Sequence, residues 1–202
     1  MIIKLYPENP REDYIKDIVN KLENNGIIIY PTDTVYAFGC AIDKPKAADR
    51  IVRLKGSKKD KLDFSLIFEN ISQAAEYTKP IDNYVFKAMK NHLPGPFTFL
   101  LEANNNNPKI FRKKKKTVGV RIPDNGITAA IVKELGRPLL TTSIHDDDDI
   151  IEYTSNPELL YEKYRNIVDI VVDGGIGGNE PSTIIDTTQG ELEIVRQGKG
   201  IL

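Results

Sequence analysis

Segments with the apolar pattern of β-strands alternate with segments that have the pattern of α-helices along this chain of 202 residues. Within 15–22 the apolar residues recur at i, i+3, i+4 and i+7, which places them on one face of a helix. The apolar run 27–30 stops at Pro31, as a buried strand would. Near the C-terminus two strand-like segments, 183–186 and 192–196, follow each other without a helix between them. This order predicts an α/β fold with a mixed parallel and antiparallel sheet and flanking helices.

Capping residues, glycines and prolines suggest where these elements begin and end. Strands are expected over 2–6, 27–30, 35–42, 64–68, 97–101, 118–121, 139–143, 167–172, 183–186 and 192–196. Helices are expected from a cap at Asn9 and Pro10 to Gly26, over 45–54 behind a cap at Asp43, from near 71, from near 82, over 127–135, and after Ser155, Asn156 and Pro157. No internal repeat or long linker divides the chain, so residues 1–202 are expected to form a single domain.

The near-neutral charge of the chain conceals a strong segregation of charge. Lys and Arg number 28 and Asp and Glu number 29, a formal charge of −1. Segment 44–61 has eight basic and two acidic residues, and segment 109–121 has seven basic residues and no acidic one. The remaining 13 basic and 27 acidic residues give the rest of the chain a charge of −14. Two basic islands in an acidic protein are suited to an anionic ligand.

Rare residue types exclude several classes of site. One cysteine, Cys40, cannot form an intramolecular disulfide, and the two histidines, His92 and His145, have no metal-binding spacing. We therefore expect no metal site built from protein ligands. Residues 1–8 lack the features of a signal peptide, and no apolar stretch approaches the ~20 residues that cross a bilayer. These observations predict a cytoplasmic protein with no membrane contact.

Polar residues gather where predicted strands end. Thr32, Asp33 and Thr34 follow one strand and can either bind a polar ligand or cap a turn. Arg121 lies within an apolar strand, where a cation needs a partner such as a ligand carboxylate or phosphate. Lys55 precedes a glycine in a loop, which is typical both of an anion site and of a solvated basic surface. No catalytic triad, carboxylate pair or metal triad is present, so this chemistry would rely on positioning and electrostatics, as in nucleotidyl or phosphoryl transfer.

Five segments, in the same order, resemble motifs of the YrdC/YciO family. They are Pro31-Thr32-Asp33-Thr34-Val35-Tyr36, Leu93-Pro94-Gly95-Pro96-Phe97-Thr98, Val120-Arg121-Ile122-Pro123, Thr142-Ser143 and Pro181-Ser182-Thr183-Ile184-Ile185-Asp186. The resemblance implies a twisted mixed α/β sheet around a basic groove. It also implies a nucleotidyltransferase that condenses L-threonine, bicarbonate and ATP, with Mg²⁺ and no tightly bound cofactor, to threonylcarbamoyl-AMP and pyrophosphate. That reaction is the first step of tRNA threonylcarbamoyladenosine formation.

The resemblance also assigns roles to individual residues. Thr34 and Arg121 are expected to contact threonine, and Lys55 and Arg121 are expected to be catalytic. Contacts to the nucleotide or its phosphates are implied for Lys55, Thr98, Ser143, Ser182 and Arg196.

Two motifs differ from those of the family's synthases. A Lys-x-Arg is replaced by Lys55-Gly56-Ser57, and a Ser-x-Asn by Ser143-Ile144-His145, which makes His145 a candidate substitute for the asparagine. These differences place the chain nearer the short YciO-like paralogues. They also leave open a non-catalytic role, binding double-stranded RNA or tRNA in translation or ribosome assembly. For that role Lys113, Lys114, Lys115 and Lys116 are the expected RNA contacts.

Overall fold

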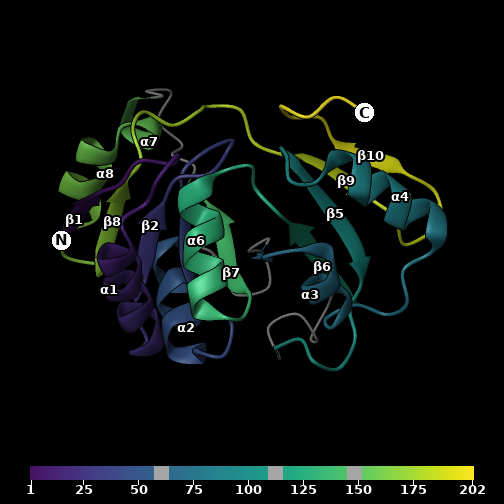
Figure 1. Ribbon diagram of the computed structural model, residues 1–202, viewed down its shortest axis with the longest axis horizontal. Helices are drawn as coiled ribbons and strands as arrows, with labels where there is room; N and C mark the ends of the chain where they lie inside the picture. The colour runs from purple at the N-terminus through teal and green to yellow at the C-terminus, as the bar shows by residue number, and fades with distance from the viewer. Residues whose placement is uncertain (57–63, 109–115, 145–151) are drawn as a thin grey trace.

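A computed structural model describes residues 1–56, 64–108, 116–144 and 152–202 as one ten-stranded sheet with helices on both faces (Figure 1). The strands are β1 (Ile2–Lys4), β2 (Ile28–Tyr30), β3 (Ala37–Ala41), β4 (Ser65–Ile67), β5 (Phe97–Glu102), β6 (Thr117–Arg121), β7 (Leu139–Ser143), β8 (Ile170–Asp173), β9 (Thr183–Asp186) and β10 (Glu193–Arg196). The helices are α1 (Glu12–Glu23), α2 (Pro45–Leu54), α3 (Ile71–Ala75), α4 (Asn83–His92), α6 (Gly126–Leu135), α7 (Glu152–Ser155) and α8 (Pro157–Tyr164).

The sheet is mixed, as the alternation of elements predicts. Its strand order is β1-β8-β2-β3-β7-β4-β6-β5-β9-β10. Parallel pairs are β1 with β8, β2 with β8, β4 with β6, and β5 with β9. The other five pairs are antiparallel. Neighbouring strands are often far apart in sequence, so the chain passes back and forth between the two ends of the sheet.

Several boundaries differ from the expected ones. The helix α1 does not start at Asn9 and Pro10, because its N-cap is Arg11, and the acidic Glu12 and Asp13 in its first turn favour the helix dipole there. Lys44 rather than Asp43 precedes α2, with no side-chain cap. The cap Asn156 of α8 is confirmed, since its side chain accepts a hydrogen bond from the amide of Glu158 at 2.9 Å. The short helix α7 has no counterpart among the expected elements.

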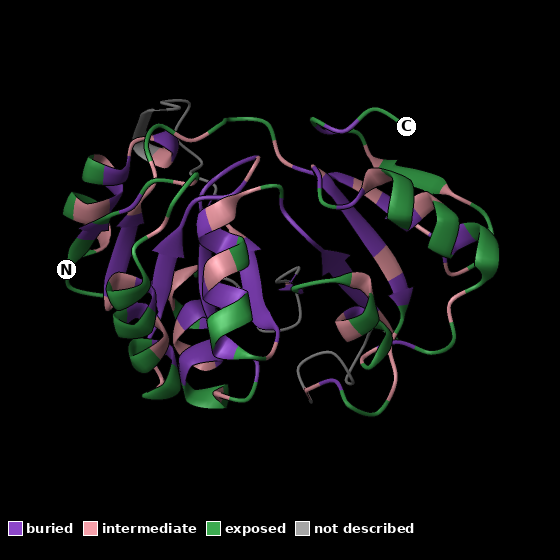
Figure 2. Ribbon diagram, in the orientation of Figure 1, coloured by how far each residue is buried: buried purple, intermediate pink, exposed green. Residues whose placement is uncertain are grey.

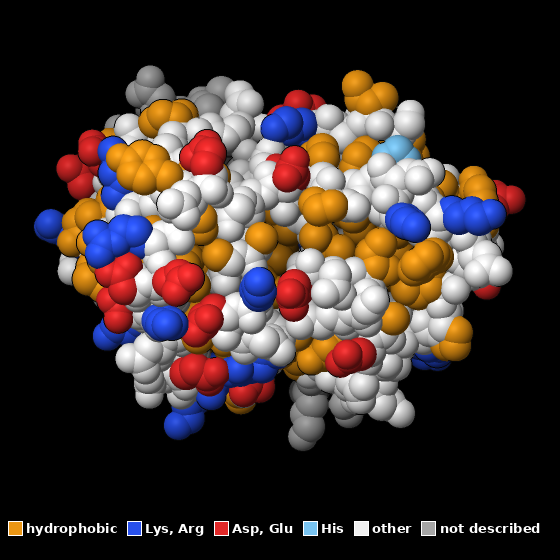
Figure 3. All heavy atoms as spheres, viewed as in Figure 1, with side chains coloured by type: hydrophobic (Ala, Val, Ile, Leu, Met, Phe, Trp, Pro, Cys, Tyr) orange, Lys and Arg blue, Asp and Glu red, His pale blue; other side chains and the backbone are white. Residues whose placement is uncertain are grey.

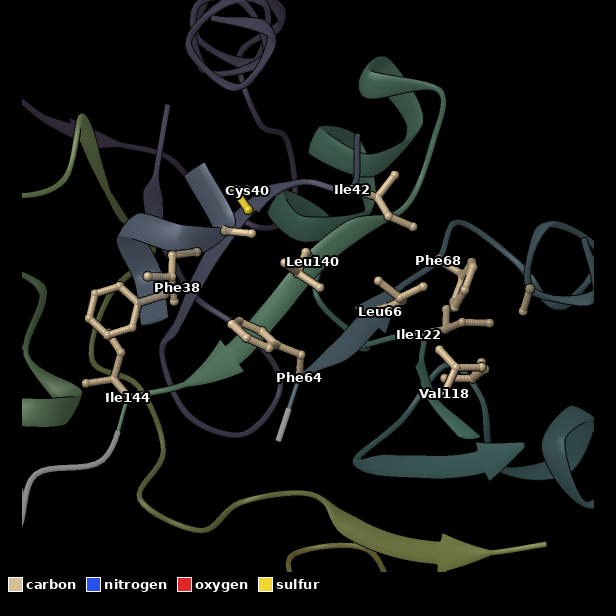
Figure 4. Packing of buried hydrophobic residues seen from close by; sticks show 14 of the residues in the cluster. Phe38, Cys40, Ile42, Phe64, Leu66, Phe68, Val118, Ile122, Leu140 and Ile144 are labelled. Atoms are coloured by element: carbon tan, nitrogen blue, oxygen red, sulfur yellow. The ribbon is translucent and has the colours of Figure 1, made fainter. Parts of the chain in front are cut away.

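The two faces of the sheet carry two separate apolar clusters. The larger cluster contains Phe38, Leu66 and Leu140 (Figure 4) and receives side chains from α2, α3, α4 and α8. The smaller cluster on the opposite face receives side chains from α1 and α6. Figure 2 shows the result, with buried strands in the centre and exposed residues on the outer sides of the helices. The longest described helix, α1, has 12 residues, and none of the described helices is long and apolar enough to cross a membrane.

The smaller cluster covers only part of its face. Along the strand order, Ile67 of β4 is the last member of this cluster. No described residue of the next strands, β6, β5 and β9, belongs to it. On the strands beyond β4, the side chains of this face therefore do not belong to the apolar cluster that α1 and α6 cover.

Leu66 tests this packing. It is fully buried at the centre of β4, and in register it pairs with Leu140 on one side and Val120 on the other. We expect Leu66→Ala to lower the free energy of unfolding by about 2–5 kcal/mol, because a buried cavity replaces the side chain. Urea denaturation measures this change. Ile194→Ala, at a residue that is 43% exposed, is the control and should cost much less; equal costs would contradict the assigned core.

Candidate functional site

Arg121 and Ser143 lie on the same face of the sheet. Leu139 of β7 pairs with Ile67 of β4, and Ile67 pairs with Arg121 of β6, so the three side chains form one row across the sheet. Leu139 and Ile67 both belong to the smaller apolar cluster. Ser143 is four residues after Leu139 on the same strand, and side chains alternate between faces, so it shares this face.

Thr98 of β5 and Ser182, the residue before β9, continue the same face. Val120 pairs with Phe99, so Arg121 and Thr98 are the next residues on neighbouring strands, which run about 4.8 Å apart. Phe99 belongs to the larger cluster, which places Thr98 on the opposite face. The Thr98 hydroxyl lies 2.8 Å from that of Ser182. Four residues expected at the site thus share one face of the sheet, although they are distributed over 85 positions of sequence: Thr98, Arg121, Ser143 and Ser182.

A buried ion pair joins this face to the β2–β3 loop. Nη2 of Arg121 donates to Oδ1 of Asp33 at 2.9 Å and to Oγ1 of Thr34 at 3.1 Å. The side chains of Arg121 and Asp33 are only 5% and 8% exposed. Nε of Arg121 and Oδ2 of Asp33 are buried and make no hydrogen bond within the described parts of the chain. A buried donor and a buried acceptor of opposite charge are therefore left without a hydrogen-bond partner at one place.

The β2–β3 loop is held in shape by its own threonines. Oγ1 of Thr32 donates to the carbonyl of Val35 at 2.7 Å, accepts from the amide of Thr34 at 3.1 Å, and lies 3.0 Å from Oγ1 of Thr34. A second loop, 174–182, packs against it so closely that a Cβ on Gly178 would lie 2.3 Å from the carbonyl oxygen of Thr34. The capped-turn interpretation of Thr32 is thus correct, and it coexists with the placement of Thr34 beside Arg121.

Arg196 completes a second polar cluster. Its Nη2 donates to the carbonyl of Ser182 at 2.7 Å, and its Nε does so at 3.3 Å. Nη2 also lies 3.4 Å from the Ser182 hydroxyl, which in turn contacts Thr98. Thr98 and Ser182 are almost fully buried. Hydroxyls and a guanidinium here offer donors suited to phosphate oxygens.

Lys55 approaches Ser143 from α2, which packs on the opposite face. It is the C-cap residue of α2, and its ammonium donates to the Ser143 carbonyl at 2.8 Å. The structure thus brings together these two residues, which the motif resemblance also places together.

Two buried hydroxyls lie close to these residues. The hydroxyl of Tyr30 lies 2.6 Å from that of Thr141, whose residue pairs with Ser65 in the same sheet. Burial raises the pKa of Tyr30 to about 12, so the phenol stays neutral at physiological pH. The neutral phenol shares a hydrogen bond with the Thr141 hydroxyl.

Several expected residues fall outside the described chain. His145 and Lys113, Lys114 and Lys115 lie in 145–151 and 109–115, and Lys116 is exposed at the start of the next described segment. The basic groove stays a prediction for the same reason. In the first basic island two cations have local acidic partners at 3.4 Å, since Lys44 meets Glu23 and Arg50 meets Asp169.

The sequence marked Asp33 as part of a polar segment but did not identify it as the partner of Arg121. The strand-embedded Arg121 indicated that a partner was needed, and we expected a ligand; the protein itself supplies one carboxylate oxygen. The signal was present in the polar segment Thr32-Asp33-Thr34, but nothing local connects it with a residue 88 positions later. Among the described residues no group of three His, Cys, Asp or Glu could hold a metal ion.

Removal of the Asp33 charge tests the ion pair. We expect Asp33→Asn to lower the free energy of unfolding by about 3–5 kcal/mol, because the buried guanidinium of Arg121 loses its counter-charge. Denaturation in urea measures this loss. Glu23→Gln is the matched control: Glu23 pairs with Arg137 at 2.7 Å at the surface, where an ion pair contributes about 1 kcal/mol or less. A cost for Asp33→Asn no larger than that of the control would refute the buried pair.

Known proteins share this sequence pattern over most of the chain. The model of the Sua5/YciO/YrdC family, described as telomere recombination, matches residues 20–198. The YciO protein of Escherichia coli K12 is 36% identical over 198 residues, which cover 97% of this chain and 94% of YciO. A threonylcarbamoyl-AMP synthase of Marinobacter nauticus is 29% identical over 171 residues, covering 82% of this chain and 87% of the synthase.

Solved structures share the fold as well. The crystal structure of Escherichia coli YciO matches with a TM-score of 0.91 and 34% identity, over 100% of this chain and 97% of that one. Sua5 of P. abyssi in complex with L-threonine matches with a TM-score of 0.87 and 25% identity, over 98% of this chain and 57% of Sua5. The chain therefore belongs to the Sua5/YciO/YrdC family.

Proposed function

We propose that this protein binds L-threonine and ATP and has the nucleotidyltransferase activity of a threonylcarbamoyl-AMP synthase, acting in tRNA modification. The relatives named as threonylcarbamoyl-AMP synthases and the Sua5 structure with L-threonine support this reaction class. This chain covers 87% of the Marinobacter nauticus synthase, so the likeness to a named synthase extends over most of that protein.

The observation that carries the proposal is the incomplete hydrogen bonding of the Arg121–Asp33 pair. An amino acid has a carboxylate that accepts hydrogen bonds and an amine that donates them. Nε of Arg121 supplies a buried donor for the first, and Oδ2 of Asp33 a buried acceptor for the second. The Thr34 hydroxyl beside them is suited to the polar side chain of threonine.

The second cluster suits the nucleotide. In our proposal Thr98, Ser182 and Arg196 contact its phosphates from the neighbouring strands, and Lys55 with Ser143 does so from the end of β7. Mg²⁺ would arrive as the ATP complex and neutralise phosphate charge, held by the phosphate oxygens. The described residues offer no three-ligand cluster of their own for it.

The two clusters are adjacent, which is what the reaction needs. Threonine and bicarbonate first give a carbamate with loss of water. A carbamate oxygen then forms a bond to the α-phosphorus, and the bond from that phosphorus to the bridging oxygen breaks, with its electron pair leaving on pyrophosphate. Arg121 would hold the amino acid for this attack, and Lys55 would stabilise charge on the phosphates. His145, in place of the asparagine of the synthases, is our proposed substitute donor.

Pyrophosphate release tests the proposal. We expect release to require L-threonine, bicarbonate and ATP together. Thr34→Val keeps the volume of the side chain and leaves the Arg121–Asp33 pair intact, but removes one hydroxyl. We expect it to raise the KM for threonine about three- to tenfold, the effect of one neutral hydrogen bond.

Thr187→Val is the matched control, because its buried hydroxyl bonds the Leu100 carbonyl at 2.8 Å in the turn after β9. It should leave the KM for threonine unchanged. Absence of turnover, together with absence of threonine and ATP binding in calorimetry, would refute the proposal.

The described residues do not favour the RNA-binding alternative. Two cations of the first basic island have acidic partners, and acidic and basic side chains are interspersed on the face shown in Figure 3. If the run 113–116 nevertheless binds duplex RNA or tRNA, affinity should fall steeply with salt, and alanine at all four lysines should flatten that slope. Filter binding across a salt series measures both, and an affinity that ignores salt would exclude the alternative.

A further inference from the structure

The C-terminal segment after β10 returns to the proposed site. In Figure 1 it runs from the end of β10 back toward the middle of the molecule. The amide of Lys199 donates to the Pro181 carbonyl at 2.9 Å, and the amide of Gly198 donates to Oγ1 of Thr183 at 3.0 Å. Oγ1 of Thr183 donates onward to the Gly200 carbonyl at 2.6 Å. These bonds attach the segment to the residues on either side of Ser182.

At one position the backbone of this segment lies too close to the residues before β9 to leave room for a side chain. A Cβ on Gly198 would lie 2.2 Å from the Pro181 carbonyl oxygen and 2.8 Å from that of Ser182. Gly198 itself is buried, whereas the next residue, Lys199, is exposed. A fixed backbone therefore presents an exposed lysine side chain at a defined place.

The Lys199 side chain reaches across to the other cluster. Its ammonium donates to the main-chain carbonyl of Asp33 at 2.6 Å. Lys199 thus spans from the segment beside Ser182 to the residue that pairs with Arg121. It connects the cluster proposed for threonine with the cluster proposed for the nucleotide.

The charges at this place do not balance. The carboxylate of Asp33 is paired with the guanidinium of Arg121 at 2.9 Å. The Lys199 ammonium has a carbonyl as its partner and makes no ion pair with any described residue. An ammonium has three donors, of which the carbonyl uses one. One positive charge with two donors is therefore available between the clusters.

We propose that Lys199 binds an oxyanion of the substrates at the junction of the two clusters, either the carboxylate of the amino acid or carbamate, or an α-phosphate oxygen of the nucleotide. This inference rests on the proposed function and adds a residue to it. In the transfer step above, the ammonium neutralises charge where the carbamate oxygen meets the α-phosphorus. Lys199 donates hydrogen bonds there and undergoes no net proton transfer.

Two substitutions distinguish an electrostatic role of Lys199 from a purely structural one, in which its hydrogen bond only holds the β2–β3 loop in place. Lys199→Arg keeps the positive charge, whereas Lys199→Gln keeps only a neutral donor that can still reach for a carbonyl. We expect Lys199→Gln to weaken ligand binding about 10- to 100-fold, the effect of losing a charged hydrogen bond, and Lys199→Arg to restore most of it. The side chain is exposed, so both variants should unfold at the same urea concentration as the wild type.

Calorimetry with Mg-ATP, inorganic tripolyphosphate and L-threonine, each titrated separately, reads out which oxyanion is bound. Weaker binding of ATP and tripolyphosphate assigns Lys199 to phosphate, and weaker binding of threonine alone assigns it to the carboxylate. Lys79→Gln is the control, since Lys79 pairs with Glu102 at the surface at 3.1 Å.

The outcomes distinguish the two proposals. A wild type that binds all three ligands, with Lys199→Gln equal to it, would overturn the role of Lys199 and leave the proposed function standing. Full activity of Lys199→Gln with loss in Lys199→Arg would equally overturn it, because a clamp and not a charge would be needed. A wild type that binds neither ATP nor threonine would overturn both.

Discussion

The buried ion pair between Arg121 and Asp33 is the interaction on which the proposed site depends. A guanidinium that is 5% exposed is stable only with a counter-charge and satisfied donors. Asp33 supplies the charge from the loop between β2 and β3. The ion pair therefore connects this loop with β6, which lies in the other half of the strand order. In our proposal the remaining unpaired atoms of this pair, Nε and Oδ2, bind the amino acid.

The pair lies in a part of the sheet that the helices cover unevenly. On one face four helices pack over a continuous apolar cluster, whereas on the other face α1 and α6 pack only as far as β4. Arg121 of β6, Thr98 of β5 and Ser182, which precedes β9, therefore lie buried on a part of this face that does not belong to the cluster under α1 and α6. A sheet covered equally on both sides would have required apolar residues at these three positions.

Membership of the Sua5/YciO/YrdC family and the local chemistry lead to the same type of site. The chain resembles YciO over nearly its full length and also resembles named threonylcarbamoyl-AMP synthases at lower identity. Its two motif differences, at Ser57 and His145, lie outside the described residues. In the structure Arg121 contacts Thr34, and Thr98 contacts Ser182. In our proposal Lys199 adds a cation to the site from a different segment.

Local patterns in the sequence determined the kinds of element, the mixed sheet, the polar strand ends and the need of Arg121 for a partner. They could do so because helix and strand periodicity, capping and burial of charge act within a few residues. Only the tertiary structure decided which strands are neighbours, and hence that Thr98 lies beside Arg121 and Ser182. It alone showed that Asp33 pairs with Arg121, 88 positions away, and that Lys199 contacts Asp33, 166 positions away. Such contacts depend on strand order and loop packing, and no local pattern specifies these.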